Sequence, residues 1–361
     1  MNTVLFENLK IGTLAIAVPI IQGGMGVRVS NSSLASAVSN EGALGIIAAI
    51  GLGDYDENKS RDYVERSRNA FIESIRQTRK KTKNPFGVNI MCALTNYEDL
   101  VTVAQDEEVD VIISGAGLPL RLPSYIKNNK TKLIPIVSSG RAAHLICNTW
   151  LRRYDRLPDA IIVEGPMAGG HLGYSRAEIA DKENFSLDNI LKEVITTVRG
   201  FSRNGVDIPV IAAGGIYDGK DIARVMKLGA AGVQMGTRFV CTDECDVAQE
   251  YKDAYIAAND EDVVIIQSPV GMPGRVIIND FIRKISKERV DFGCAYQCLH
   301  TCKPKEVNYC IAKALDNAAK GLMDIGFAMA GSNVSRIKEI VSVKHLIDEL
   351  TTDARAALAT A

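Results

Sequence analysis

The stretch IPVIAAGGIYDGKDIARVMKLGAAGVQMGTRF, residues 208 to 239, decides the fold that this chain is expected to adopt. It holds two short apolar runs, residues 208–212 and 232–235, separated by a glycine pair and an amphipathic segment, residues 218–227. Runs rich in Val, Ile and Ala that are bounded by glycine predict parallel strands buried on both faces. The stretch therefore predicts one strand, one helix and a second strand parallel to the first.

The same alternation extends outward through most of the chain. Eight strand-like runs alternate with eight helix-like segments, and eight such units predict an α/β fold of the TIM (β/α)8 barrel type. A doubly wound open sheet is the alternative, but no G-x-G-x-x-G follows the first run. The expected strands are residues 19–22, 44–48, 86–91, 109–114, 133–137, 160–163, 208–212 and 232–235. The expected helices are residues 32–40, 60–83, 97–106, 120–128, 142–152, 187–202, 218–227 and one from about residue 245.

The domain organisation follows from where this pattern stops. We expect residues 1–280 to form the barrel, with residues 262–282 as a structured loop rich in proline and glycine. Residues 281–361 are then an appended segment, rich in cysteine and helical over about residues 306–318 and 335–350. No low-complexity linker separates the two parts, so this segment is expected to pack on the barrel.

Composition excludes several classes of protein. The 361 residues include 47% hydrophobic and 24% charged side chains, and the net charge is −1, which argues against disorder and against general binding to nucleic acid or a membrane surface. The N-terminal residues lack a signal-peptide pattern, and the apolar runs are too short to span a bilayer. The sequence therefore predicts a cytoplasmic protein with reduced thiols.

A local excess of basic residues stands out over residues 59–83, which end in Arg79, Lys80, Lys81 and Lys83. A solvated helix face is the ordinary interpretation of such a run. The sharper hypothesis is a docking patch for an acidic carrier protein or for the phosphates of coenzyme A.

The loops that follow the predicted strands carry the chemically informative residues. Gly214 and Gly215 follow the seventh strand, and Gly236 and Thr237 follow the eighth. In TIM barrels these two loops bind phosphate through backbone N–H groups and a helix N-terminus. Gly23 and Gly24 follow the first strand and allow close approach of a flat or anionic ligand, although a tight turn is an equal interpretation.

The sixth loop, EGPMAGGHLG, contains His171 between Gly170 and Leu172. Its glycine neighbours give this imidazole little cover, so it is exposed to solvent or reaches into a ligand cavity. A histidine at the mouth of a barrel can exchange a proton near neutral pH, as a general acid or base requires. Asn89, at the end of the third strand, is a polar group for a ligand or a cap for the next helix.

With these motifs in order, the chain resembles the FMN-dependent family that contains nitronate monooxygenases (2-nitropropane dioxygenases) and the FabK-type enoyl-acyl-carrier-protein reductase II. The resemblance covers about the first 280 residues, through PIIQGGMG, FGVNIM, SGAGLP, EGPMAGGHLG, IPVIAAGGIYDGKD and GVQMGTRFV. It implies bound FMN and a catalytic His171. The implied FMN contacts are Gly23, Gly24, Met25, Asn89, Ser138, Glu164, Gly169, Gly170, Gly214, Gly215, Gln234, Met235, Gly236 and Thr237.

Within that family, Glu164 occupies a position where the reductases typically have Glu and the monooxygenases Gln. The resemblance therefore favours NAD(P)H-dependent reduction of an enoyl thioester or similar activated alkene, with His171 as the proton donor. The thioester would be carried by acyl carrier protein or coenzyme A, and a homodimer is compatible with this assignment. Oxidation of alkyl nitronates with oxygen is the alternative, and a flavin and cysteine redox sensor or partner protein is an alternative of another class.

A cysteine cluster has no counterpart in the commoner pattern of either group. Cys294, Cys298 and Cys302 are spaced to form one stripe on a helix, and Cys310 follows. Four thiolates so placed could hold an iron–sulfur cluster or zinc. The spacing differs from the usual ferredoxin runs, and a stripe of cysteines can also be a buried apolar face.

Overall fold

The structure, a computed structural model, describes residues 6–53, 62–202, 207–294 and 297–360. Its centre is an eight-stranded parallel sheet in which neighbouring strands follow the order β3-β11-β10-β8-β7-β6-β5-β4. A parallel bridge between Ile21 and Leu44 joins the first and last strands and closes the barrel. The strands are β3 (Ile20–Gln22), β4 (Gly45–Ala48), β5 (Phe86–Met91), β6 (Val111–Gly115), β7 (Lys132–Val137), β8 (Ile161–Glu164), β10 (Val210–Ala213) and β11 (Gly232–Met235).

The TIM barrel predicted from the sequence is confirmed, and each of the eight predicted strands overlaps an observed one. The strands fit their positions because both faces are buried. β4, β10 and β11 have no residue that is more than slightly exposed, as expected for parallel strands that are covered by helices outside and by side chains inside.

The interior of the barrel is filled by aliphatic side chains, including Ile46, Ile113 and Ile211. A short antiparallel hairpin, β1 (Leu9–Ile11) and β2 (Leu14–Ile16), adds Leu9 and Ile11 to the same cluster. The sequence analysis did not predict this hairpin. It packs against the barrel interior and leaves the carboxyl ends of the strands free to form a site.

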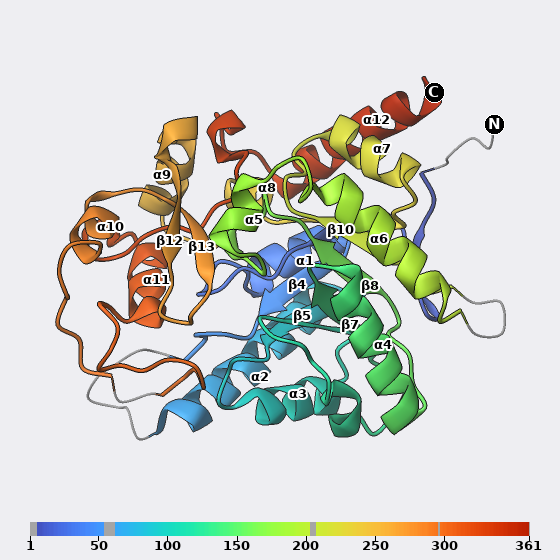
Figure 1. The fold of residues 1–361 in the computed structure, drawn as a ribbon, viewed down its shortest axis with the longest axis horizontal. Coiled ribbons are helices and arrows are strands. Elements are labelled where there is room, and N and C mark those ends of the chain that lie inside the picture. The colour runs from blue at the N-terminus through green and yellow to red at the C-terminus, as the bar shows by residue number, and fades with distance from the viewer. Residues whose placement is uncertain (1–5, 54–61, 203–206, 295–296, 361) are drawn as a thin grey trace.

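Helices surround the barrel, and most follow the predicted pattern (Figure 1). One prediction is wrong: residues 120–128 contain only a 3-10 turn, η2 (Leu122–Tyr125), with Pro123 in its first turn. Proline supplies no N–H donor, and in this segment a short turn replaces a helix. The helices are α1 (Ser32–Asn40), α2 (Tyr63–Lys81), α3 (Tyr97–Asp106), α4 (Gly140–Tyr154), α6 (Leu187–Arg199) and α7 (Gly219–Lys227).

The eighth place in the helix ring is filled from the far end of the chain. Only α8 (Thr237–Val240) and α9 (Gln249–Ala257) follow β11 directly, whereas α12 (Val343–Ala359) packs against both α7 and α1. Figure 1 shows α12 alongside α7. The contact is close, because a Cβ built on Gly219 would lie 2.3 Å from the backbone nitrogen of Ala354. The helix expected from about residue 245 therefore does not complete the ring.

Between α9 and α12 the chain forms a cap on one side of the barrel mouth. The segment expected to be a loop at 262–282 contains an antiparallel hairpin, β12 (Val263–Gln267) and β13 (Pro273–Ile277), and β13 also pairs with β9 (Gly170–His171). The helix expected at 306–318 overlaps α11 (Ile311–Ala319), whereas only the second half of the helix expected at 335–350 falls within α12, because residues 337–342 are not helical. The other cap elements are η3 (Asp260–Asp262), α10 (Asp280–Ile285), η4 (Met323–Ile325) and η5 (Val334–Arg336), and the short helix α5 (Arg176–Ala180) follows β9. No helix among the described residues is long and apolar enough to cross a membrane.

Candidate active site

One pocket lies where the carboxyl ends of the barrel strands meet the cap, and it gathers nearly all the residues that the sequence singled out. His171 and every residue predicted to contact FMN except Ser138 line it, whereas the four predicted metal-ligating cysteines do not. The predicted residues in its wall are Gly23, Gly24, Met25, Asn89, Glu164, Gly169, Gly170, His171, Gly214, Gly215, Gln234, Met235, Gly236 and Thr237. Ser138 lies to one side, with its Oγ against Gly173 and its carbonyl accepting from the Tyr174 hydroxyl at 3.1 Å.

The glycine rim of the pocket comes from the loops after β10 and β11. Gly214 and Gly215 have φ angles of +89° and +81°, which residues other than glycine rarely adopt. A Cβ on Gly214 would lie 2.8 Å from the carbonyl oxygen of Gly165, so the position also has no room for one. Within the described residues, the backbone N–H groups of these two glycines donate no hydrogen bond. This rim therefore offers free donors to an anion.

The opposite wall offers amide groups to a flat polar ligand. Gly24 packs so closely on Asn89 that a Cβ would lie 2.3 Å from that of Asn89. Gln234 is 8% exposed, and its buried Oε1 has no hydrogen-bond partner among the described residues. An orphaned acceptor in a pocket costs free energy unless a ligand donates to it. The anion rim, the close-packed glycines and the unpaired amide oxygen fit a flavin mononucleotide, whose ring carries an N–H donor and whose tail carries a phosphate.

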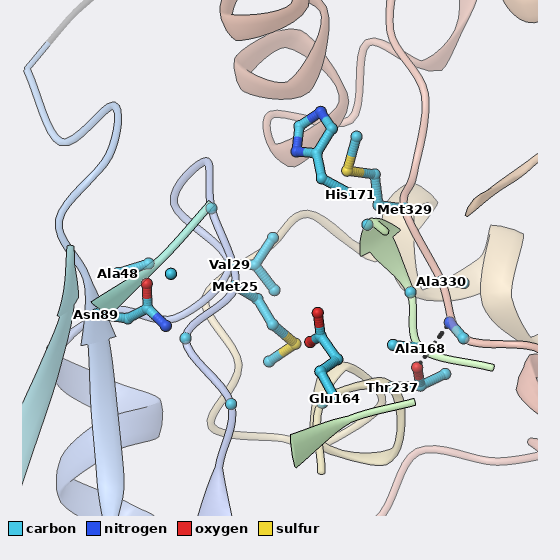
Figure 2. Close-up of a pocket in the computed structure, with 18 of the residues that line it drawn as sticks. Met25, Val29, Ala48, Asn89, Glu164, Ala168, His171, Thr237, Met329 and Ala330 are labelled. Carbon is cyan, nitrogen blue, oxygen red and sulfur yellow. Dashed lines mark hydrogen bonds between the residues drawn. The ribbon is translucent and has the colours of Figure 1, made fainter. Parts of the chain in front are cut away.

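Two titratable side chains, Glu164 and His171, line the pocket (Figure 2). Burial raises the pKa of Glu164 to about 7, and within the described residues its carboxyl group makes no hydrogen bond. Burial lowers the pKa of His171 to about 4, so the ring is neutral at pH 7. The Nε2 atom of His171 is 2.8 Å from the Oγ of Ser268. Both side chains thus carry perturbed pKa values in a cleft, which is typical of functional groups.

The cap supplies pocket residues that the sequence analysis missed. Tyr251 and Tyr255, stacked with ring centroids 5.5 Å apart, and Met329 line the wall beside the barrel rim. Two hydrogen bonds join the cap to the rim: the Gly331 N–H donates to Thr237 Oγ1 at 2.9 Å, and Asn333 Nδ2 donates to the Gly215 carbonyl at 2.9 Å. The run of mostly small residues at 328–333 was the only local signal in the sequence that the cap backbone lies close to the rim.

Apolar side chains, largely from the cap, also line the pocket. Leu299, Ala312 and Leu315 come from the cap, and Val27 and Ile50 come from the barrel loops. Backbone hydrogen bonds hold residues 298–300 to residues 93–95, and Arg28 Nε lies 2.6 Å from Asp316 Oδ1 on α11. Asp316 is buried, with its side chain 4% exposed. The cap wall is therefore tied to the barrel at several points.

The helical stripe predicted for the cysteines is corrected by the structure, whereas a metal site there stays a prediction. Cys298 and Cys302 lie outside any helix, so they form no helical stripe, and all four cysteines are free thiols. Burial raises the pKa of Cys298 to about 12, and the neighbouring Cys310, Cys294 and Cys302 add to the rise. Across the described residues, no group of three or more His, Cys, Asp or Glu side chains is arranged to hold a metal ion.

Most of the basic run predicted as a docking patch lies on α2, its residues 59–61 lie outside the described part of the chain, and part of the run is paired. Arg76 and Arg79 contact Glu107 and Asp110 at 2.7 Å and 3.1 Å, and Arg79 also stacks over the Phe86 ring. These two side chains lie against α3 and β6, as part of the ordinary cover of the barrel. A docking role for this face stays a prediction.

Comparison with known proteins places this architecture in a family. Residues 7–103 and 93–353 match the family profile described as "Nitronate monooxygenase". The chain belongs to the nitronate monooxygenase family. The family match extends through the cap to α12, beyond the 280 residues on which the sequence resemblance rested.

Relatives in and around the nitronate monooxygenase family carry different activities in their names. A "Probable nitronate monooxygenase" of Staphylococcus aureus is 30% identical over 77% of this chain and 80% of its own length. A "(3aS,4S,5R,7aS)-5-hydroxy-7a-methyl-1-oxo-octahydro-1H-indene-4-carboxyl-CoA dehydrogenase" of Rhodococcus jostii is 30% identical over 74% of this chain. This chain spans 64% of the length of that relative. FabK from Thermotoga maritima superposes with a TM-score of 0.74 at 32% identity, covering 95% of this chain and 94% of its own.

Proposed function

We propose that this protein is an FMN-dependent oxidoreductase that uses NAD(P)H to reduce an enoyl thioester or a similar activated alkene. The observation that carries the proposal is the shape of the pocket. A rim suited to phosphate and flavin continues into an apolar end, and His171 and Glu164 lie in the same pocket. An acyl chain next to a polar reacting group matches such a pocket, and two similar proteins are named as a FabK and a CoA-ester dehydrogenase.

FMN, when bound, supplies hydride chemistry, which the side chains of this site do not provide. The residues that would hold it are Gly214, Gly215, Gly236 and Thr237 at the phosphate and Gly23, Gly24, Asn89 and Gln234 at the ring system. The protein keeps these groups preorganised, because positive φ angles and close packing leave Gly214 and Gly24 little freedom to move.

His171 has the role of hydrogen-bond donor to the substrate. The sequence predicts it as the proton donor, and the lowered pKa means that it acts from a neutral ring at pH 7. A neutral imidazole keeps one N–H, which can donate to the thioester oxygen where negative charge develops. Glu164 is close to half protonated at neutral pH, because its pKa is raised to about 7. It is therefore a second group in the pocket that can carry a proton to the reduced carbon.

The decisive experiment separates the reductase from the nitronate enzyme. Under anaerobic conditions we expect NADH or NADPH to bleach the flavin absorbance near 450 nm, and crotonyl-CoA to restore it. Measurement of both half-reactions by stopped-flow absorbance tests each step. No bleaching by either nicotinamide, together with turnover of propionate 3-nitronate and oxygen, would instead assign the protein to nitronate oxidation. A purified protein without flavin absorbance would refute both assignments.

A further inference from the structure

The hairpin β12–β13 borders the pocket through Val270 in its turn and contacts the loop that carries His171. β13 pairs with β9 in the register Gly274 to His171 and Arg275 to Gly170, and the Leu172 N–H donates to the Pro273 carbonyl at 2.9 Å. Arg275 is 7% exposed, and its Nη1 donates to the carbonyl oxygens of Pro166 at 2.7 Å and Ala168 at 2.5 Å. The backbone that positions His171 is thus held from the cap side.

Among the described residues, the same hairpin provides the single hydrogen-bond partner of the His171 ring. Ser268 lies in the turn between β12 and β13, is 3% exposed, and places its Oγ 2.8 Å from Nε2. No hydrogen bond of the described residues uses Nδ1, and His171 lines the pocket. One ring nitrogen is therefore engaged by the protein, and the other remains for a ligand.

The hydrogen-bond inventory of Ser268 indicates which of the two atoms donates. The Val270 N–H points to the Oγ at 3.3 Å, so the hydroxyl oxygen already accepts one hydrogen bond. The hydroxyl proton has no acceptor among the described residues other than Nε2 of His171. If Nε2 carried the proton, Oγ would face two N–H donors while its own buried proton lacked a partner, which costs free energy.

We propose that Ser268 sets the tautomer of His171: its hydroxyl donates to Nε2, so the ring proton resides on Nδ1 and Nδ1–H is the donor that the substrate meets. Ser268 is a positioning residue, because it acts on the substrate only through His171. A hydrogen bond to one ring nitrogen is the usual means by which a protein decides what the other nitrogen offers. The role assigned to Nδ1–H rests on the proposed function, whereas the tautomer itself does not.

The tautomer can be observed directly by 15N NMR of protein with labelled histidine. The chain has four histidines, and the His171 signals are assigned by their loss in His171→Gln. At pH 7 we expect a neutral ring with protonated Nδ1 and unprotonated Nε2. A ring protonated on Nε2, or a charged ring at this pH, would overturn the proposal without any measurement of turnover.

Variants of Ser268 test the cause of that tautomer. Ser268→Ala should give a mixture of the two tautomers. It should lower kcat for crotonyl-CoA about tenfold and change KM less than about twofold, because part of the protein then carries the ring proton on Nε2 while the pocket is intact. Ser268→Thr keeps a hydroxyl and should restore the Nδ1–H signal. Ser286→Ala, at an exposed serine after α10, is the matched control and should change neither signal nor rate.

The outcomes separate this inference from the proposed function. An Nδ1–H tautomer that Ser268→Ala disturbs, in a protein that turns over no enoyl thioester, would refute the proposed reaction and keep the role of Ser268. Rapid enoyl reduction with an Nε2–H tautomer would do the reverse. A Ser268→Ala protein whose His171 signals match those of the wild type would also refute the role of Ser268.

Discussion

The two sides of the pocket are built in different ways. The barrel side consists of loops that each follow a strand, and its glycines have fixed conformations set by their own backbones, as at Gly214. The cap side is assembled from segments far apart in the chain, which side-chain contacts such as Arg28 with Asp316 hold in place. The difference teaches that the proposed cofactor site belongs to the repeating strand–loop–helix unit, whereas the surroundings of His171 and the apolar part of the pocket depend on the cap.

The largest effect should come from the residue at which the two sides meet. His171→Ala removes the hydrogen-bond donor to the substrate while leaving the glycine rim intact. We therefore expect FMN to stay bound and turnover of crotonyl-CoA to fall at least about 100-fold. Flavin content and steady-state rates measure the two effects. His345→Ala changes an exposed histidine on α12 and should behave as the wild type. Unchanged activity of His171→Ala would remove His171 from the chemistry.

The next effect tests the rim alone. Gly214→Ala combines a positive φ with a Cβ only 2.8 Å from a carbonyl oxygen, so we expect FMN affinity to fall about 100-fold through loss of the phosphate site. Fluorescence titration with FMN measures it. Gly271→Ala is the matched control, because its φ is +86° but no atom lies within 4 Å. Equal losses in the two variants would mean that backbone strain, and not the rim, is responsible.

A smaller effect should follow from loosening the cap. Arg28→Met leaves the buried Asp316 with Lys320 as its remaining partner, and we expect a loss of about 2 kcal/mol in the free energy of unfolding. Urea denaturation measures this loss, and FMN affinity should change little. Arg283→Met breaks an exposed pair with Asp280 and should be neutral. A loss of FMN equal to that in Gly214→Ala would show that cap and rim are not separable.

The smallest effect concerns the pH dependence of cofactor affinity. Because the pKa of Glu164 is raised to about 7, its carboxyl group is mostly neutral at pH 6 and mostly ionised at pH 8. The negative charge that appears over this range should weaken binding of the anionic FMN, by less than about tenfold per pH unit. Isothermal titration across this range should find the decline in the wild type and a flatter profile in Glu164→Gln. Identical profiles would remove Glu164 as the cause.

Much of the barrel side could be predicted because its signals are local. The strand Gly232–Met235 and the helix that begins after Asp218 are both visible as short apolar and amphipathic runs, and glycine pairs such as Gly214 and Gly215 mark the loops between them. Burial on both faces forces strands to be apolar, so these apolar runs can be recognised in a single sequence. The segment with Pro123 shows the limit, since an amphipathic run there forms only a short turn.

The cap could not be predicted in the same way, because its contacts join residues far apart in the chain. α12 takes the eighth place in the helix ring from about a hundred residues beyond the last barrel strand, and periodicity contains no information about which helix fills a distant gap. The cysteine spacing suggested a helical stripe, but residues 298–300 pair with residues 93–95, and the described residues 297–302 take no helical form. Long-range packing decided its conformation.

The sequence by itself determined the barrel, the glycine rim and the choice of His171, because backbone conformation and burial leave a local pattern of residue types. Only the tertiary structure decided what His171 can do. Its surroundings lower its pKa, and Ser268, 97 residues away in the chain, engages one of its nitrogens. The chemical state of a buried histidine depends on neighbours that meet it only after folding, since desolvation and hydrogen bonding are properties of the packed environment.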